Sequence, residues 1–267
     1  MTIGRGTRLA LTVAAAAILA FVYLPIALIV VYAFNSGTTP SWPPVGFTLH
    51  WFEEAIRNTG LQQAFLTSMA AALAATIIAL VLGTLASLAV SRYRFFGRDA
   101  ISLIVIFPIA LPGIVTGMAL SSTFSQVGIP LGFLTIIIGH ATFCIVLVYN
   151  NAIARLRQTS ATFEEASADL GADSWTTFRY ITFPNLRSAL LAGALLAFAL
   201  SFDEVIVTIF TAGGVKTLPI WIFQSFRLAN QVPVVNVAGL FAILLSVIPV
   251  YVATRITSST GVAGSRV

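Results

Sequence analysis

The sequence predicts an all-α membrane protein with six transmembrane helices. Hydrophobic residues make up 58% of the 267 residues and charged residues only 9%, whereas soluble domains average about 25% charged residues. The charges are also bunched, so long stretches carry none, and a membrane-spanning helix needs roughly 20 consecutive apolar residues. These observations leave little room for a soluble domain, and we expect a single transmembrane domain over residues 1–267.

The six predicted spans follow the apolar stretches in chain order, at residues 9–34, 63–91, 100–124, 130–150, 187–210 and 236–256. The third and fourth spans share one charge-free stretch, and Gly128 and Pro130 mark a turn between them. The first span could be a signal peptide, because Arg5 and Arg8 precede it. Its apolar run is longer than the roughly 7–15 residues of a signal sequence, so we expect an uncleaved first helix.

The basic residues predict the orientation, because Lys and Arg in short loops favour the cytoplasmic side. With the N-terminus inside, only Arg57, Lys216 and Arg227 of the 14 basic residues lie outside, and the other 11 lie inside. We therefore expect a multi-pass protein of the cell (inner or plasma) membrane with both termini cytoplasmic. This bias accounts for the net charge of +5, so membrane lipid is an expected partner and nucleic acid is not.

Two predicted outside segments carry interfacial signals. In the first, residues 35–62, large apolar side chains recur at roughly helical spacing and predict a short amphipathic helix. These side chains are Phe47, Trp51, Phe52 and Ile56, followed by Phe65 just beyond the segment. The helix could be a membrane-surface anchor or a docking surface for an external protein. The second segment follows the fifth span. Gly213, Gly214 and Pro219 indicate that the helix does not continue through it.

The longest predicted cytoplasmic segment, residues 151–186, has the pattern of two short helices joined by a turn. Thr162 and Glu165 resemble a capping box, and Gly171 permits a sharp turn. Pro184 is expected to end the second helix as the chain re-enters the membrane. The pair is too small to be a domain but could dock onto another protein. Its candidate surface residues are Ala166, Leu170, Trp175 and Phe178.

Within this segment, Glu165 to Pro184 resembles the EAA signature of ABC-importer permeases. The signature is E-A-A, three residues, G, nine residues and I-x-L-P, and here Ser167 replaces the second Ala and Phe183 replaces the Leu. In that family the segment forms coupling helices that dock into a cleft of the ATP-binding subunit. The resemblance implies a type I ABC-importer permease fold with a coupling segment at about 160–184. The matching residues are Glu165, Ala166, Gly171, Ile181 and Pro184.

The stretch from Ser201 to Phe223 resembles the second permease of spermidine/putrescine-type ABC importers, and the six-span layout agrees. The resemblance implies a partner permease that is homologous but different, two copies of an ATP-binding subunit, and an extracytoplasmic binding protein that delivers substrate. We therefore expect a permease subunit for putrescine, spermidine or a related small organic cation. An ABC importer for another small solute remains the nearest alternative.

The sequence independently predicts that another subunit supplies the energy. It contains no G-x-x-x-x-G-K-[ST] pattern, and its only Lys is Lys216 on the predicted outer side. We expect no ATPase site, cofactor or metal in this chain, with ATP and Mg held by the partner subunit. Cys144 is the only cysteine, and a lone cysteine provides neither an internal disulfide nor a metal framework. An intramembrane enzyme is disfavoured because no paired nucleophile and base are evident.

Asp203 and Glu204 are the candidate substrate contacts, together with Ser201 and Trp221. The two acids are the only charged residues in the apolar run 190–210, and a carboxylate in a bilayer normally faces a bundle interior, a partner or a water-filled path. At 1.5 Å per residue they lie about 24 Å from the inner end of the span, in its outer half. One or both could attract an ammonium group, helped by a cation–π contact with Trp221.

Two alternatives for this acidic pair remain open. The acids could be structural, as an ion pair or hydrogen bond with the other permease or as a helix N-cap after a break. Gly193, Ala197 and Ser201 share the helix face of Glu204, and such small residues favour close helix packing against the bundle or the partner. The acids could also form the ion site of a proton- or sodium-coupled secondary transporter. No internal repeat supports that reading.

Overall fold

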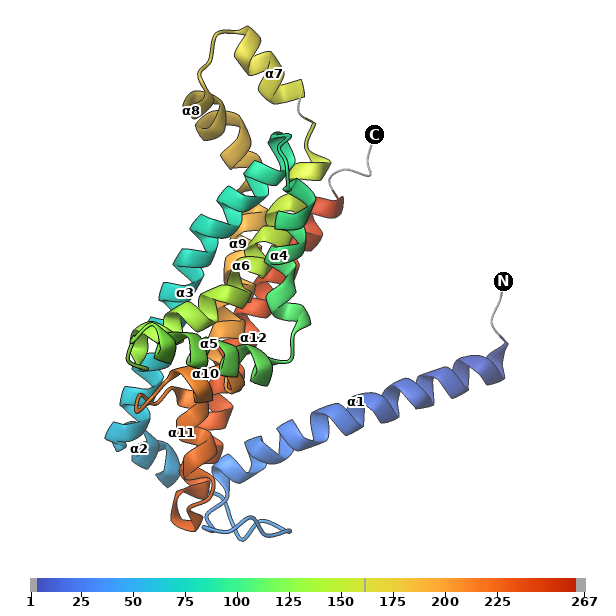
Figure 1. Ribbon diagram of the computed structural model, residues 1–267. Coiled ribbons are helices and arrows are strands. Elements are labelled where there is room, and N and C mark those ends of the chain that lie inside the picture. The colour runs from blue at the N-terminus through green and yellow to red at the C-terminus, as the bar shows by residue number, and fades with distance from the viewer. Residues whose placement is uncertain (1–3, 161, 263–267) are drawn as a thin grey trace. The chain divides into compact units, whose positions relative to one another are not determined.

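The computed structural model describes residues 4–160 and 162–262, and the regular elements within these ranges are all helical (Figure 1). This confirms the predicted all-α class. The chain divides into two compact units. The first comprises the described residues up to Gln62 together with Ile222–Ile243, and the second comprises Gln63–Trp221 and the described residues from Leu244 onward. We describe each unit by itself.

In the first unit, α1 (Arg5–Phe34) leads into a loop and then α2 (His50–Arg57). The predicted short amphipathic helix is therefore confirmed as α2. The Phe52 ring lies 4.9 Å from the Phe34 ring and 6.4 Å from Phe241 near the start of α12 (Val232–Val262), measured between centroids. Trp51 Nε1 donates a hydrogen bond to the Asn35 carbonyl at 2.8 Å, which holds α2 against the end of α1.

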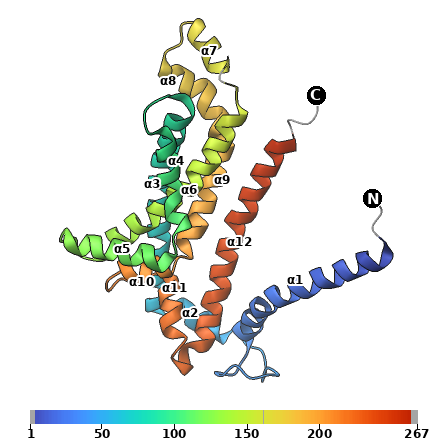
Figure 2. The same cartoon turned by 45° about the vertical axis from the view of Figure 1, so that its right-hand side comes forward.

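The second unit contains a bundle in which α3 (Thr59–Arg92), α4 (Arg98–Ala110), α6 (Phe133–Gln158) and α9 (Phe183–Phe202) run side by side (Figures 1 and 2). Glycines allow two of these helices to approach α6 closely. A Cβ on Gly83 of α3 would lie 3.0 Å from Val148 Cβ, and one on Gly193 of α9 would lie 3.1 Å from Val148 Cα. The small-residue face of the fifth span thus meets α6 of the same chain, which is one of the two partners expected for it.

We predict that Gly193→Leu sharply lowers the yield and melting temperature of the purified complex. The added side chain would meet the α6 backbone, and overpacking typically costs about 1–3 kcal/mol or more. Ala194→Leu is the matched control, because Ala194 lines an open groove between α3 and α9. Thermal unfolding followed by size-exclusion chromatography checks the pair. Equal stability of the two variants would contradict the close packing of α9 on α6.

The third predicted span, 100–124, is not one helix, and this part of the prediction was wrong. Its two halves, α4 and α5 (Gly113–Gln126), are bent by 107° at a break. Pro112 is the physical reason, because proline lacks an N–H and forces the preceding residue out of helical geometry. Leu111 accordingly has φ −82° and ψ 144°. The turn predicted around Gly128 is present, with φ +73° at that residue.

The fifth span also differs from its prediction at both ends. Pro184 does not end a separate short helix. Instead α8 (Ser174–Thr177) continues through the π-helical turn η1 (Phe178–Thr182) into α9. Within η1 the Phe183 N–H donates to the Phe178 carbonyl five residues back. This wider turn lets the helix pass Pro184, whose ring would clash with a carbonyl in regular α-helical geometry.

At the other end, α9 stops at Phe202 and not near residue 210. Three residues separate it from α10 (Ile206–Thr211), which is followed by α11 (Leu218–Ser225). The break falls at Asp203 and Glu204, where backbone hydrogen bonding changes from the α9 pattern to a cap on α10. We call residues 203–205 the α9–α10 break.

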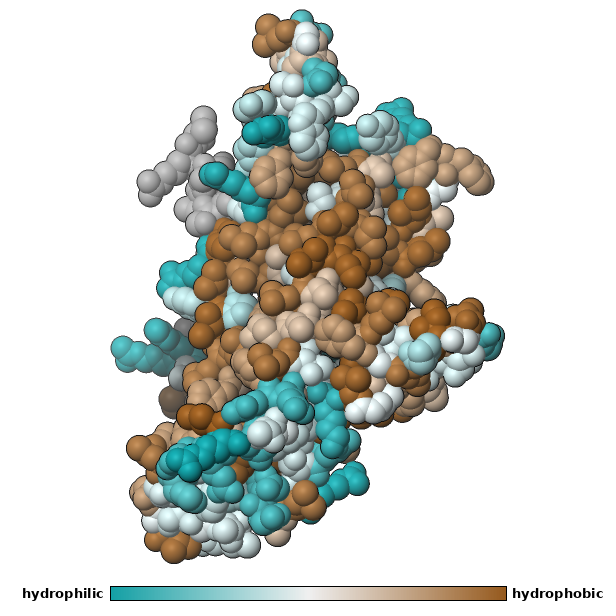
Figure 3. All heavy atoms as spheres, turned by 90° about the vertical axis from the view of Figure 1, so that its left-hand side faces the viewer, coloured by the Kyte–Doolittle hydropathy of each residue, from teal (hydrophilic) through white to brown (hydrophobic). Residues whose placement is uncertain are grey.

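Five helical segments in the described ranges are long and apolar enough to cross a membrane, and the bent pair α4–α5 brings the total to six if it counts as one span. These correspond to the six predicted spans. In Figure 3 hydrophobic side chains cover the face formed by the bundle of the second unit, and hydrophilic and hydrophobic ones are mixed at its α7–α8 end. The remaining described elements are α7 (Thr162–Asp169) and η2 (Ala229–Gln231).

Candidate functional site: the α7–α8 hairpin and the α9–α10 break

Residues 162–177 form a compact helical hairpin, which we call the α7–α8 hairpin. Gly171 between its helices has φ +83°, a left-handed conformation that residues with a Cβ rarely adopt. The Gly171 N–H donates to the Ala168 carbonyl at 2.9 Å, and the Ala172 N–H donates to the Ser167 carbonyl at 3.1 Å. The sharp turn predicted at Gly171 is therefore confirmed.

Asp173 begins the second helix of the hairpin as an N-cap. Its Oδ1 accepts a hydrogen bond from the Thr176 N–H at 2.8 Å. Hydrogen bonding from the Thr176 side chain, and then from the Thr176 N–H, lowers the pKa of the Asp173 carboxyl below its ordinary value. A lowered pKa means that the ionised cap is fully present at neutral pH and is lost only as pH falls through that lowered pKa. The hairpin therefore keeps its cap under physiological conditions.

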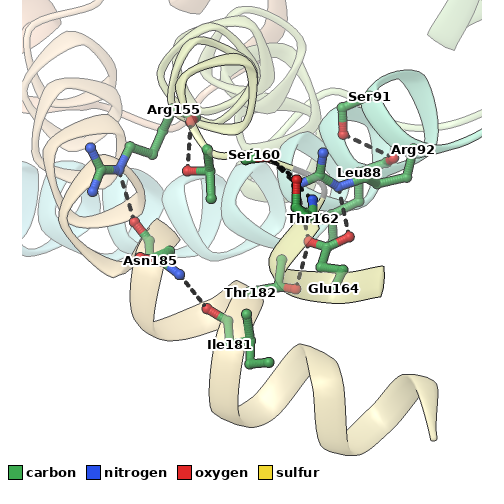
Figure 4. A network of polar contacts seen from close by, with 11 residues as sticks. Leu88, Ser91, Arg92, Arg155, Ser160, Thr162, Glu164, Ile181, Thr182 and Asn185 are labelled. Carbon is green, nitrogen blue, oxygen red and sulfur yellow. Dashed lines mark hydrogen bonds and ion pairs between the residues drawn. The ribbon is translucent and has the colours of Figure 1, made fainter. Parts of the chain in front are cut away.

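An ion pair fastens the hairpin to the helix bundle (Figure 4). Arg92, at the end of α3, approaches both carboxylate oxygens of Glu164 in α7 through one edge of its guanidinium group. The Nε–Oε2 distance is 2.8 Å and the Nη2–Oε1 distance is 2.9 Å. Thr182 of η1 donates a further hydrogen bond to Glu164 Oε1 at 2.9 Å. Both charged side chains are only about one-fifth exposed (19% and 23%), so the pair joins three segments away from bulk water.

Two more contacts hold the hairpin and its base. Ser167, which replaces the second Ala of the signature, is buried and shares a 2.9 Å hydrogen bond with the Thr177 hydroxyl. This bond links α7 directly to α8. At the base, Arg155 Nε of α6 donates to the Asn185 carbonyl of α9 at 3.0 Å (Figure 4). Sequence reasoning missed the Arg92–Glu164 ion pair. The available signals were an acid beside the signature Glu165 and an arginine directly after the second predicted span.

The outer surface of the hairpin is exposed and partly apolar. Leu170 is 90% exposed and Trp175 66% exposed. Phe178 is half-buried and stacks on the Trp175 ring, with centroids 5.7 Å apart. Of the residues that match the signature, Glu165, Ala166 and Gly171 lie on this exposed hairpin, whereas Ile181 and Pro184 lie in the helix that supports it. The bonded hairpin is therefore a fixed surface with exposed apolar side chains.

The two acids at the α9–α10 break have different surroundings. Glu204 is half-buried, and its Oε1 accepts the Val207 N–H at 2.9 Å. Glu204 precedes Val205, the N-cap residue of α10, and its side chain caps the first turn from outside the helix. This is close to the helix cap after a break that was one of the structural alternatives. Asp203 is exposed, and its carboxylate has no hydrogen-bond or ion-pair partner among the residues that the structure describes. A carboxylate within a span is costly when it has no partner. Of the two acids, Asp203 is therefore the one whose carboxylate is available to a ligand or another subunit.

The other two predicted pathway residues are buried. Ser201 bonds to His140 Nδ1 at 2.8 Å, and Trp221 in α11 is only 7% exposed. In this conformation the structure therefore places neither side chain on an open surface with Asp203. His140 is satisfied as expected for a buried histidine, but its second partner, Thr208 Oγ1 at 2.8 Å, comes from the far side of the break. No local sequence signal links these residues, which are far apart along the chain.

The structure thus combines several helices long and apolar enough to cross a membrane with an exposed hairpin and an acid-bearing break. Residues 79–260 match the family described as "Binding-protein-dependent transport system inner membrane component". The chain therefore belongs to this permease family, and its multi-pass inner-membrane character and role as a transport subunit follow.

Curated relatives support the membership over most of the chain. The spermidine/putrescine transport system permease protein PotC of Haemophilus influenzae is 35% identical over 240 residues, which cover 89% of this chain and 92% of that protein. The putrescine transport system permease protein PotI of Escherichia coli K12 is 35% identical over 217 residues, covering 78% and 76%. The predicted resemblance to the spermidine/putrescine type is confirmed.

Solved structures confirm the importer fold. A bacterial ABC transporter involved in the import of the acidic polysaccharide alginate matches with a TM-score of 0.70 and 18% identity, over 97% of this chain and 99% of that chain. The MetNI methionine ABC transporter matches with a TM-score of 0.59 and 16% identity, over 80% and 99%. At these identities the likeness shows the type I permease fold alone.

Proposed function

We propose that this chain is the transmembrane permease subunit of an ATP-driven importer for putrescine, spermidine or a related small organic cation. One observation carries the substrate class. In a chain related to polyamine permeases, the structure leaves the Asp203 carboxylate exposed and unpaired among the described residues at a break in a membrane span. A fixed negative charge at such a place attracts an ammonium group more strongly than it would in bulk water.

The proposal assigns energy coupling to the α7–α8 hairpin. Two copies of an ATP-binding subunit would hold ATP and Mg, and one of them would receive the exposed hairpin surface, with Glu165, Ala166 and Gly171 forming its turn and flank. Ile181 and Pro184 would support it from the helix below. The bonds from Glu164 to Arg92 and Thr182 support this role, because a hairpin that is fixed to the bundle can transmit a displacement.

The proposal also includes the remaining partners. A second, homologous permease would complete the pathway beside this chain, and an extracytoplasmic binding protein would deliver the substrate. Asp203 would contact the passing ammonium group. Glu204 would set the local backbone by capping α10, while Ser201 and Trp221 would become accessible only in another conformation of the complex.

The decisive experiment is transport by the purified complex reconstituted in liposomes with its binding protein. We expect labelled putrescine or spermidine to accumulate in an ATP-dependent way and to stimulate ATP hydrolysis. Unlabelled polyamine should compete, whereas an anionic or neutral solute should not. Robust transport of an anionic or neutral solute without polyamine uptake would refute the cation assignment and leave the permease family unaffected.

The proposed topology makes a separate prediction. After Cys144→Ala, Phe96→Cys in the turn between α3 and α4 should resist a membrane-impermeant thiol reagent in intact cells, and Val45→Cys should react. Phe96 is fully exposed and Val45 is 75% exposed, and neither lies on the hairpin surface proposed to dock, so a difference between them reports sidedness and not burial. Permeabilised cells provide the control, in which both cysteines should react. Labelling of Phe96→Cys from outside would contradict cytoplasmic termini and a cytoplasmic hairpin.

A further inference from the structure

A continuous series of hydrogen bonds bridges the α9–α10 break through His140 of α6. Ser201 Oγ of α9 lies 2.8 Å from His140 Nδ1, and Thr208 Oγ1 of α10 lies 2.8 Å from His140 Nε2. Thr208 Oγ1 in turn donates to the Glu204 carbonyl at 2.7 Å. The side chains of all three residues at these contacts are at most 2% exposed, so water does not compete for these bonds.

The set of partners favours one direction for each bond. A threonine hydroxyl has a single hydrogen, and that of Thr208 is used by the Glu204 carbonyl. Thr208 Oγ1 can therefore only accept from His140, which requires the hydrogen on Nε2. A neutral imidazole with its hydrogen on Nε2 accepts at Nδ1, so the Ser201 hydroxyl donates to it. The neutral Nε2–H form of His140 satisfies all of these groups at once.

Other contacts hold α10 on the same helix. Thr135 Oγ1 of α6 lies 2.7 Å from the Thr211 carbonyl at the end of α10 and 2.9 Å from the Gly132 carbonyl, so its one hydrogen is shared between the two carbonyls. Between the two attachments, a Cβ on Gly139 would lie 3.2 Å from Val207 Cγ1, so α6 and α10 are in close contact there. The Glu204 side chain caps α10, and the Glu204 backbone carbonyl accepts a hydrogen bond from Thr208. Both parts of this acid are therefore bonded to α10, which α6 holds in place.

We propose that His140, as the neutral Nε2–H tautomer, is a positioning residue for transport. It ties α9 to α10 across the break and thereby sets where the carboxylates of Asp203 and Glu204 face. The transport consequence rests on the proposed function, because it assumes that the acidic pair meets the substrate. The tautomer and the tie between the helices do not depend on that assumption.

The first test reads the tautomer directly. In the assembled complex labelled with ¹⁵N-histidine, the difference between the wild-type and His140→Gln spectra isolates this residue. We expect a protonated Nε2 and an unprotonated Nδ1 resonance. The opposite tautomer, or a charged imidazolium, would overturn the assigned direction of the bonds. If the His140→Gln complex does not assemble, Thr208→Val serves as the second comparison. In that variant the Nε2 resonance should move.

The second test separates positioning from simple stability. Thr208→Val removes the hydroxyl with little change in shape, whereas Thr208→Ser is the matched control that keeps it. Per assembled complex, we expect Thr208→Val to raise the KM for putrescine uptake about fivefold, the change expected for one lost buried hydrogen bond. Thr208→Ser should stay within about twofold. A lower yield of Thr208→Val complex with an unchanged KM would overturn the positioning role.

The two proposals fail in different ways. If the wild-type complex transports no polyamine but moves another solute, the proposed substrate class is wrong, and the same Thr208 pair is then measured with that solute. A KM that still rises only in Thr208→Val supports the positioning role of His140, and an unchanged KM overturns it. The ¹⁵N result decides the tautomer in either case.

Discussion

Asp203→Asn is expected to lower polyamine uptake about tenfold or more while leaving assembly of the complex intact. The amide keeps the size of the carboxylate but loses its charge, and the lost attraction for an ammonium group is larger in a low-dielectric setting than in water. A tenfold change corresponds to about 1.4 kcal/mol. Because the Asp203 carboxylate has no partner among the described residues, the change removes no contact that holds the chain together. Uptake per assembled complex is the measurement.

Glu204 provides the comparison, because its carboxylate has a structural partner. Glu204→Gln keeps an acceptor oxygen for the Val207 N–H and should affect assembly little. Glu204→Ala removes the cap and should destabilise the chain by about 1 kcal/mol, a typical cost for losing an N-cap. Wild-type uptake in Asp203→Asn would remove that residue from the substrate pathway. Loss of assembly in the same variant would show that Asp203 pairs with another subunit.

Gly171→Val is expected to abolish the coupling of ATP hydrolysis to uptake or to prevent assembly with the ATP-binding subunit. The left-handed backbone at Gly171, φ +83°, costs about 1–2 kcal/mol for an ordinary residue and more for a β-branched one. No atom lies within 4 Å of a Cβ at this position, so the strain is in the backbone and not in packing. The turn should therefore open and move the exposed hairpin surface.

Ala172→Val is the matched control for this variant, because it adds the same side chain at the next residue, where φ is not positive. The comparison uses ATPase stimulation by loaded binding protein, uptake, and co-purification of the ATP-binding subunit. We expect Ala172→Val to retain coupling. Normal assembly and normal coupling in Gly171→Val would count against a docking role for the hairpin.

The sequence predicted those parts of the fold that depend on local composition. Charge-free stretches locate the spans because charges are costly in the bilayer, and Gly171 marks a turn because few other residues tolerate its conformation. The bend between α4 and α5 was also readable in principle, since Pro112 lies inside the third stretch. It was missed because hydrophobicity measures burial in the membrane and not the direction of the helix.

The missed parts of the site depend on contacts between distant segments. Glu164 is one residue from the signature Glu165, and only the position of Arg92 decides which of the two forms the ion pair. His140 meets Thr208, 68 residues away in the chain. Proline locally disfavours a continuous helix, yet the helix passes Pro184 by widening into a π-helical turn. Packing against the bundle must therefore override this local preference of proline.

That π-helical turn makes one uninterrupted rod of residues 174–202, which has 29 residues and a length of about 43 Å at 1.5 Å per residue. One end carries Trp175 of the hairpin, and the other leads into Asp203. A helix resists twisting, so under the proposed docking a torque applied at the hairpin would reach Asp203 through this helix alone. Conversion of η1 to regular α-helix would shift the register by one residue and turn the far end by about 100°. Under the proposed function, docking of the ATP-binding subunit and reorientation of the Asp203 carboxylate would then be a single mechanical motion.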